Sequence, residues 1–141
     1  MTNKVVIITG ATSGIGKALA LAYLEKGCAL ILTGRNPDGF ADVQGKNVDV
    51  ILGDITVQST INKVVQLAES KYGRVDVLIN NAGITFIQPF AENTSEQLDL
   101  IINTNLKSHI LLTSRLYPLM QKQQSGHIVF INSSAGKEGY K

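Results

Sequence analysis

The fold is decided by the stretch Lys4-Val5-Val6-Ile7-Ile8-Thr9-Gly10-Ala11-Thr12-Ser13-Gly14-Ile15-Gly16-Lys17. Its β-branched residues, 5–9, suit a strand that is buried on both faces of a sheet. The glycines that follow let backbone N–H groups approach an anion closely. A helix that begins near Gly14 then points its positive end at that anion. The stretch therefore predicts a strand, a phosphate-binding turn and a helix in succession.

Two known phosphate-binding patterns can be tested against this turn. The nucleoside-triphosphate loop requires G-x-x-x-x-G-K-[ST]. Gly16-Lys17 fits part of it, but Ala11 stands at the first glycine and Ala18 at the magnesium-binding hydroxyl. The dinucleotide pattern G-x-G-x-x-G also fails in its usual spacing, because Ala11-Thr12 follows Gly10. A glycine-rich turn that serves packing alone stays open as an alternative for what remains, Thr9-Gly10-x-x-x-Gly14-Ile15-Gly16.

Composition limits the classes of protein. The length of 141 residues with 44% hydrophobic content favours one globular domain, residues 1–141. The formal charge is +2 and the chain has no basic run, so we expect no nucleic-acid partner. The single cysteine, Cys28, precedes an apolar run, which favours a buried structural thiol in a reducing, cytoplasmic setting. The first apolar run is too short for a signal peptide or a membrane span, so no membrane association is expected.

Apolar runs of strand length alternate with segments of helix length along the chain. The expected strands cover residues 5–8, 29–33, 48–52, 75–79 and 127–131. This alternation predicts an α/β fold with a doubly wound parallel sheet and helices on both faces. Open sheets of this kind bind ligands at the carboxyl ends of their strands, where the polar residues of this chain gather.

A long helix is expected after Thr94, because Gln97 three residues later completes a capping-box pattern. We expect Pro118 to kink or interrupt this helix and Gly126 to end the helical pattern. Its expected inward face consists of apolar residues at helical spacing: Leu98, Ile101, Ile102, Leu106 and Ile110.

Four motifs follow the first, third, fourth and fifth expected strands, in this order: Thr9-Gly10-x-x-x-Gly14-Ile15-Gly16, Asp54, Asn80-Asn81-Ala82-Gly83 and Asn132-Ser133-Ser134-Ala135-Gly136. In this order they resemble the short-chain dehydrogenase/reductase family, and the whole chain resembles the first five strands of that family. The resemblance implies a Rossmann-type fold and hydride transfer between NAD(P)(H) and a small-molecule carbonyl or alcohol. The alternative is a cofactor-binding module without chemistry, acting as a sensor or partner subunit.

The resemblance also assigns residues to the cofactor. The glycine turn and the Ser13 hydroxyl would bind the pyrophosphate, Asp54 the adenine amino group, and Asn81 with its neighbours the ribose. Asp54 could instead be a strand-end turn or N-cap residue, and a structural role at the sheet end stays open for Asn81. The assigned positions are Gly10, Thr12, Ser13, Gly14, Ile15, Gly16, Arg35, Asp54, Ile55, Asn81, Ala82 and Gly83.

Two further positions are implied to be catalytic. Ser133 aligns with the family's serine, which hydrogen-bonds the substrate oxygen as charge develops on it. Asn105 matches the family's active-site asparagine, which holds a water path to the catalytic lysine. An asparagine within a helix competes for backbone hydrogen bonds, so solvation or a bond one turn back is the alternative for Asn105. His109 and His127 have no partner at metal-ligand spacing, so both are interpreted as structural and no metal site is predicted.

The family's Tyr-x-x-x-Lys pair and its last two strands have no counterpart in the 141 residues. Tyr140-Lys141 does not substitute, because adjacent side chains diverge whereas residues at i,i+4 share a helix face. We therefore expect a portion of a longer enzyme that is inactive alone. The strand at 127–131 would then be an apolar sheet edge, which predicts self-association.

Cofactor choice is read from the end of the second strand, Gly34-Arg35. Relatives that prefer NAD usually place an acid where Gly34 stands, and a glycine there removes repulsion against a phosphate. Arg35 can bind a 2′-phosphate in a bidentate manner. The sequence therefore predicts NADP(H) over NAD(H), with an exposed turn arginine as the alternative interpretation of Arg35.

Overall fold

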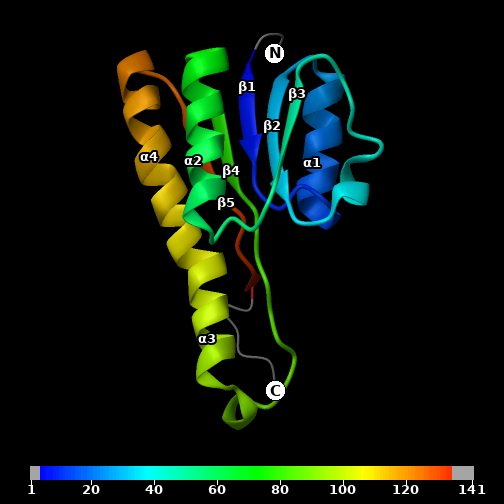
Figure 1. Cartoon of the computed structure of the whole chain (residues 1–141), viewed down its shortest axis with the longest axis vertical. Coiled ribbons are helices and arrows are strands. Elements are labelled where there is room, and N and C mark those ends of the chain that lie inside the picture. Colours follow the sequence, from blue (N-terminus) through cyan, green and yellow to red (C-terminus); the bar gives the residue numbers. More distant parts are fainter. Residues whose placement is uncertain (1–3, 135–141) are drawn as a thin grey trace.

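The computed structural model describes residues 4–134. These residues form a parallel sheet in the order β3-β2-β1-β4-β5 (Figure 1). The chain runs outward from β1 to β2 and β3, then returns to the other side of β1, so the sheet has a switch point between β1 and β4. The expected Rossmann-type fold is confirmed. The strands are β1 Val5–Ile8, β2 Ala29–Gly34, β3 Val48–Leu52, β4 Val77–Asn80 and β5 His127–Phe130.

Helices cover both faces of the sheet (Figure 1). Because alternate residues of β1 point to opposite faces, Val6 and Ile8 pack toward α1, whereas Val5 and Ile7 pack toward α2 and α4. The helical elements are α1 Gly14–Glu25, α2 Gln58–Leu67, α3 Ser95–Ile102 and α4 Ser108–Gln123, with short turns η1 Pro37–Phe40, η2 Ala68–Tyr72, η3 Phe90–Glu92 and η4 Asn103–Lys107.

The prediction of which residues of the long helix face inward is wrong. Leu98, Ile102, Leu106 and Ile110 are each 44–54% exposed, and only Ile101 is half-buried. The reason is that α3 extends past the carboxyl ends of the strands, where no sheet lies beside it (Figure 1). The π-helical turn η4 also shifts the helical face between α3 and α4. The residues of α4 that do pack inward are Ser108, His109, Leu112, Leu116 and Met120.

The ends of the long helix are otherwise defined by local chemistry. The capping box of Thr94 and Gln97 is present. The expected interruption at Pro118 is wrong, since α4 continues through it to Gln123. The C-cap residue Gln124, which follows the last helical residue, has a left-handed conformation with φ 51°.

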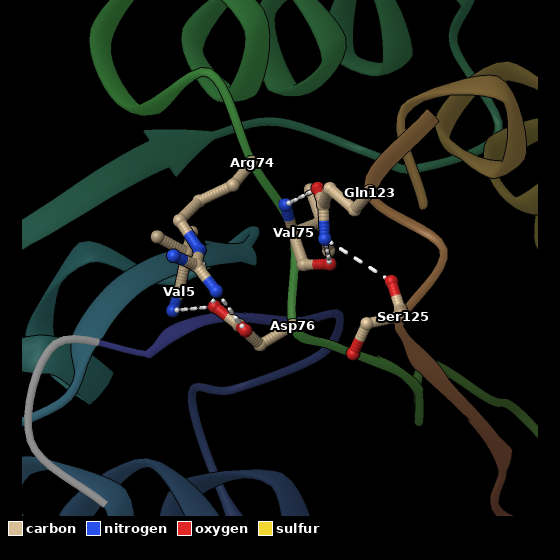
Figure 2. Close-up of polar contacts among 6 residues, drawn as sticks. All are labelled: Val5, Arg74, Val75, Asp76, Gln123 and Ser125. Atoms are coloured by element: carbon tan, nitrogen blue, oxygen red, sulfur yellow. Dashed lines mark hydrogen bonds and ion pairs between the residues drawn. The ribbon is translucent and has the colours of Figure 1, made fainter. Parts of the chain in front are cut away.

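A polar network fastens the amino ends of the strands (Figure 2). Asp76 accepts hydrogen bonds from Val5 N at 2.8 Å and from Arg74 Nε and Nη2 at 3.0 and 2.6 Å. Gln123, at the end of α4, binds both the N–H and the C=O of Val75. The network therefore holds together the start of β1, the residues that precede β4 and the end of α4. It lies at the amino ends of the strands, whereas the glycine turn lies at their carboxyl ends.

Candidate cofactor-binding site

Two glycines, one in the turn between β1 and α1 and one in the first turn of α1, leave no room for a side chain. Gly10 has a left-handed φ of 66°, and a Cβ there would lie 2.8 Å from the Cα of Ala82. A Cβ on Gly16 would overlap the amide nitrogen of Asn81 and lie 2.5 Å from the carbonyl oxygen of Gly10. The turn therefore packs directly against the segment that follows β4.

The N-terminus of α1 presents backbone donors beside the glycine turn. Ser13 is the N-cap residue and is exposed, and within the described part of the chain its side chain makes no capping hydrogen bond. The first N–H groups of α1 are therefore not taken up by this side chain. Together with the helix dipole they form a positive end beside the glycine turn.

Thr9, the last buried residue before the turn, joins β1 to the segment after β4. Its hydroxyl oxygen accepts hydrogen bonds from the N–H groups of Asn81 and Ala82, each at 3.0 Å. The Asn81 side chain donates in return to the carbonyls of Thr9 and Gly10, at 2.9 and 3.1 Å. Asn81 thus has the structural role that the sequence left open. The role of Thr9 was missed, and a polar residue that ends an apolar strand was its only signal.

Asn105 lies in the π-helical turn η4 and reaches across to the segment after β4. Its Oδ1 accepts from Ile84 N at 2.9 Å, and its Nδ2 donates to Ile84 O at 2.8 Å. The alternative of a bond one turn back is therefore wrong. The residue is exposed, so the structure does not contradict the solvation alternative. The water path to a lysine stays a prediction.

A cavity of about 380 Å³ opens at the carboxyl ends of the strands, at the switch point. It brings together every cofactor-binding residue expected from the sequence except Gly16, which packs beneath the turn. Five of the residues around it were not predicted from the sequence: Thr33, Gly53, Ile84, Thr104 and Ile131. The complete lining is Gly10, Thr12, Ser13, Gly14, Ile15, Thr33, Gly34, Arg35, Gly53, Asp54, Ile55, Asn81, Ala82, Gly83, Ile84, Thr104 and Ile131.

Asp54 and Arg35 lie at one end of this cavity. Asp54 Oδ1 accepts from both the N–H and the hydroxyl of Thr56, each at 2.8 Å, so Asp54 is a turn residue as well as a lining residue. Its Oδ2 lies 3.9 Å from Nη1 of Arg35. The Arg35 side chain is 72% exposed, and ion pairs at such exposure contribute little, so the guanidinium is not held by this contact.

The space beside Arg35 is closed to a side chain at Gly34. A Cβ there would overlap the Thr12 methyl group and lie 3.1 Å from the ring of Phe40. An acid at this position is therefore incompatible with the observed packing, quite apart from its charge.

The catalytic positions expected from the sequence are placed differently from the cofactor-binding positions. Ser133 follows β5 and is exposed, and it does not line the cavity, although Ile131 of the same segment does. Asn105 does not line it either, but its neighbour Thr104 and its partner Ile84 do. The terminal pair Tyr140-Lys141 lies outside the described residues.

Other expected features can be placed briefly. Cys28 is buried, as expected. In residues 4–134, no cluster of metal-binding side chains is found. None of the helices in that part of the chain is long and apolar enough to cross a membrane.

Comparison with known proteins identifies the class. The sequence pattern of the family described as short chain dehydrogenase matches residues 4–141, and the chain belongs to this family of oxidoreductases. It is 38% identical to a 3-oxoacyl-[acyl-carrier-protein] reductase of Thermotoga maritima, over 99% of this chain and 59% of the relative. It is 31% identical to an uncharacterized oxidoreductase of Staphylococcus aureus, over 98% of this chain and 62% of the relative. The chain thus spans about three fifths of the length of these curated relatives.

Solved structures give the same assignment. A short-chain dehydrogenase from Streptomyces avermitilis superposes with a TM-score of 0.91 at 34% identity, over 98% of this chain and 52% of that protein. A serine dehydrogenase from Escherichia coli superposes with a TM-score of 0.86 at 28% identity, over 96% of this chain and 65% of that protein.

Proposed function

We propose that residues 1–141 form one dinucleotide-binding domain of an oxidoreductase that transfers hydride between NADP(H) and a carbonyl or alcohol carbon of a small molecule. One observation carries the proposal: the cavity at the switch point is lined by the glycine turn and by the segments that follow β2, β3 and β4. Open α/β sheets bind their ligands at this place. Membership in the family supports nicotinamide chemistry there.

The residues present fit a dinucleotide. The pyrophosphate is proposed to lie against the glycine turn, where the Ser13 hydroxyl and the first N–H groups of α1 are donors. Asp54 would accept from the adenine amino group through Oδ2, because its Oδ1 is occupied by Thr56. Asn81 and the two residues after it would border the ribose, and Thr12, Ile15 and Ile55 would supply apolar contacts. The bound cofactor would supply or accept the hydride.

The preference for NADP(H) rests on Arg35. Its side chain is exposed at the cavity end and only loosely paired with Asp54, so it can turn toward a 2′-phosphate. Gly34 places no carboxylate beside that phosphate and has no room for one. A bidentate arginine–phosphate pair is a strong charge-assisted contact.

Calorimetry with NADPH and NADH tests this preference. We expect tighter binding of NADPH, and Arg35→Ala should reduce NADPH affinity about 10- to 100-fold while leaving NADH nearly unchanged. Arg115→Ala, which removes an arginine that instead bonds Asn62, is the matched control and should change neither. Equal dissociation constants for the two cofactors in the unaltered chain would refute the preference.

Ser133 and Asn105 are proposed as the catalytic residues within this chain, Ser133 as the hydrogen-bond donor to the substrate oxygen. The 141-residue polypeptide should bind NADPH yet oxidise it near the background rate with a panel of aldehydes and ketones. A missing general acid costs about a hundred- to ten-thousand-fold in rate. A longer form that reaches a downstream Tyr-x-x-x-Lys should turn over, and Ser133→Ala should lower its rate. Robust turnover by the short polypeptide that Tyr140→Phe abolishes would overturn this reasoning.

A cofactor-binding module without chemistry is the second candidate. The observation that favours it is the position of Ser133, which does not line the cavity that gathers the cofactor-binding residues. Cofactor binding with background turnover in every longer form would establish this candidate. The single buried cysteine fits a reducing, cytoplasmic setting for either function.

Self-association is proposed from the position of β5. This strand lies at one edge of the sheet that the described residues form, and Phe130 at its end is 45% exposed. An open apolar edge offers unpaired backbone groups to another chain. Light scattering of the 141-residue polypeptide at micromolar concentration should show a mass above that of a monomer, and a monodisperse monomer would contradict the proposal.

A further inference from the structure

Three polar side chains, spaced four residues apart along η4 and α4, contact every second residue of β4 and of the segment that continues it. The contacts are Asn105 with Ile84, His109 with Ala82, and Thr113 with Asn80. Four residues of a helix rise about 6 Å, and two residues of a strand advance about 6.6 Å, so the two spacings match. We call this set of contacts the polar ladder. It fixes the position of the segment 80–84 along the helix.

His109 forms the middle contact of the polar ladder. Its Nε2 lies 2.8 Å from Ala82 O, and since a carbonyl oxygen only accepts, the imidazole donates its N–H there. The side chain is buried, with its ring 6.2 Å from that of Phe130. The N–H of Ala82 is held from the opposite element by Thr9 Oγ1. The peptide groups on both sides of Ala82 are therefore fixed. Thr9, which follows β1, holds the one before Ala82, and His109 of α4 holds the one after it.

The contact has a consequence at the cavity wall. Ala82 C=O and Gly83 N–H belong to one planar trans peptide group, so they point in opposite directions. Because His109 draws the carbonyl toward α4, the Gly83 N–H is directed away from α4. Both residues line the cavity, and in residues 4–134 the Gly83 N–H has no acceptor among the hydrogen bonds formed. Among the described residues it is therefore an unused donor of a residue that lines the cavity.

We propose that His109 is a positioning residue for the cofactor, which holds the Ala82–Gly83 peptide group in the orientation that presents the Gly83 N–H to a bound dinucleotide. The proposal rests on the proposed cofactor-binding function of the cavity. His109 itself does not line the cavity, so it acts through this peptide group alone.

Three variants separate positioning from stability. His109→Leu fills the buried site without a donor, whereas His109→Gln keeps a terminal N–H within reach of Ala82. Thr113→Val removes the ladder contact to Asn80, which does not line the cavity, and is the matched control. For each variant we would measure the dissociation constant for NADPH, thermal unfolding, and hydrogen exchange of the hydrogen-bonded Ala82 and Ile84 amides without cofactor.

We expect His109→Leu to weaken NADPH binding about five- to tenfold, as loss of one buried hydrogen bond implies. It should also speed exchange at the hydrogen-bonded amides on either side of the released peptide group, Ala82 and Ile84. His109→Gln should stay within about twofold of the unaltered chain, since it keeps the donor. Thr113→Val should lower the unfolding temperature without changing NADPH affinity. The proposal is overturned if His109→Leu binds and exchanges like the unaltered chain, if His109→Gln is as weak as His109→Leu, or if Thr113→Val weakens binding equally.

Two outcomes need their own comparison. If the unaltered chain binds neither NADPH nor NADH, the cofactor function fails, and amide exchange at Ala82 and Ile84 alone decides whether His109 fixes the peptide group. If His109→Leu does not fold, His109→Asn replaces it, because its shorter amide cannot reach Ala82. Exchange at Ala82 and Ile84 as slow as in the unaltered chain would then contradict the proposal.

Discussion

Thr9→Val removes one hydroxyl group from the centre of the site and changes the side-chain shape little. Thr9 is fully buried, and its Oγ1 accepts the N–H groups of Asn81 and Ala82 at 3.0 Å each. Valine leaves both donors without that acceptor. Asn81 and Ala82 are only half-buried, so water compensates part of the loss. We expect the free energy of unfolding to fall by about 2 kcal/mol, from roughly 1 kcal/mol for each donor.

Thermal and urea unfolding measure this loss. For a domain of this size, about 2 kcal/mol lowers the melting temperature by roughly 6–10 °C. Thr33→Val is the matched control, because Thr33 is also a buried threonine at the carboxyl end of a strand, yet its hydroxyl accepts no N–H group among the described residues. That variant should stay within about 0.5 kcal/mol of the unaltered chain. If the two variants unfold alike, the hydroxyl of Thr9 does not join the two loops and the reasoning fails.

Three further changes have defined outcomes. Asp76→Ala leaves the buried N–H of Val5 without its acceptor and should lower the free energy of urea unfolding by about 1–3 kcal/mol. Arg74→Ala should lower it less, because the guanidinium is half-exposed, and equal losses for the two variants would contradict this. Gly34→Ala forces a methyl group against Thr12 and should cost about 1–3 kcal/mol, so an unchanged thermal unfolding curve would exclude the overlap. Burial lowers the pKa of His109, and its hydrogen bond to a carbonyl offsets this only partly, so the unfolded chain takes up the proton first. The stability due to neutral His109 is thus complete above about pH 6.5 and declines as pH falls below it, and His109→Leu should show less of this decline.

The strands could be predicted because their signal is local. Buried parallel strands require near-continuous apolar, β-branched runs, and residues 5–8 and 29–33 supply them with little ambiguity. The capping box at Thr94 is equally local, since it involves only residues within one turn. The glycine turn was also predictable, because only glycine suits position 10. Gly10 has a left-handed conformation, and the backbone of Ala82 lies too close to it for a side chain.

The face of the long helix could not be predicted, because periodicity shows that a helix has an apolar side without showing whether a sheet lies beside it. Leu98 and Ile102 have helical spacing, yet α3 extends past the sheet and none of its residues is buried. The contacts of Thr9 and His109 were hidden for another reason. Each contact depends on which loops the strand order of the sheet brings together. The partners are 27 residues apart in the sequence for His109 and Ala82, and 72 residues apart for Thr9 and Asn81.

The π-helical turn and the polar ladder explain each other. In a regular α-helix, four residues overshoot a full turn by about 40°, so side chains at that spacing drift around the helix. The turn η4 closes over more residues than an α-turn, which reduces the overshoot between Asn105 and His109. Both side chains can then reach the segment that continues β4. An asparagine that is unfavourable within a helix is thus satisfied by the Ile84 backbone instead of competing with its own helix, and the irregular turn lies where the helix meets the cavity wall.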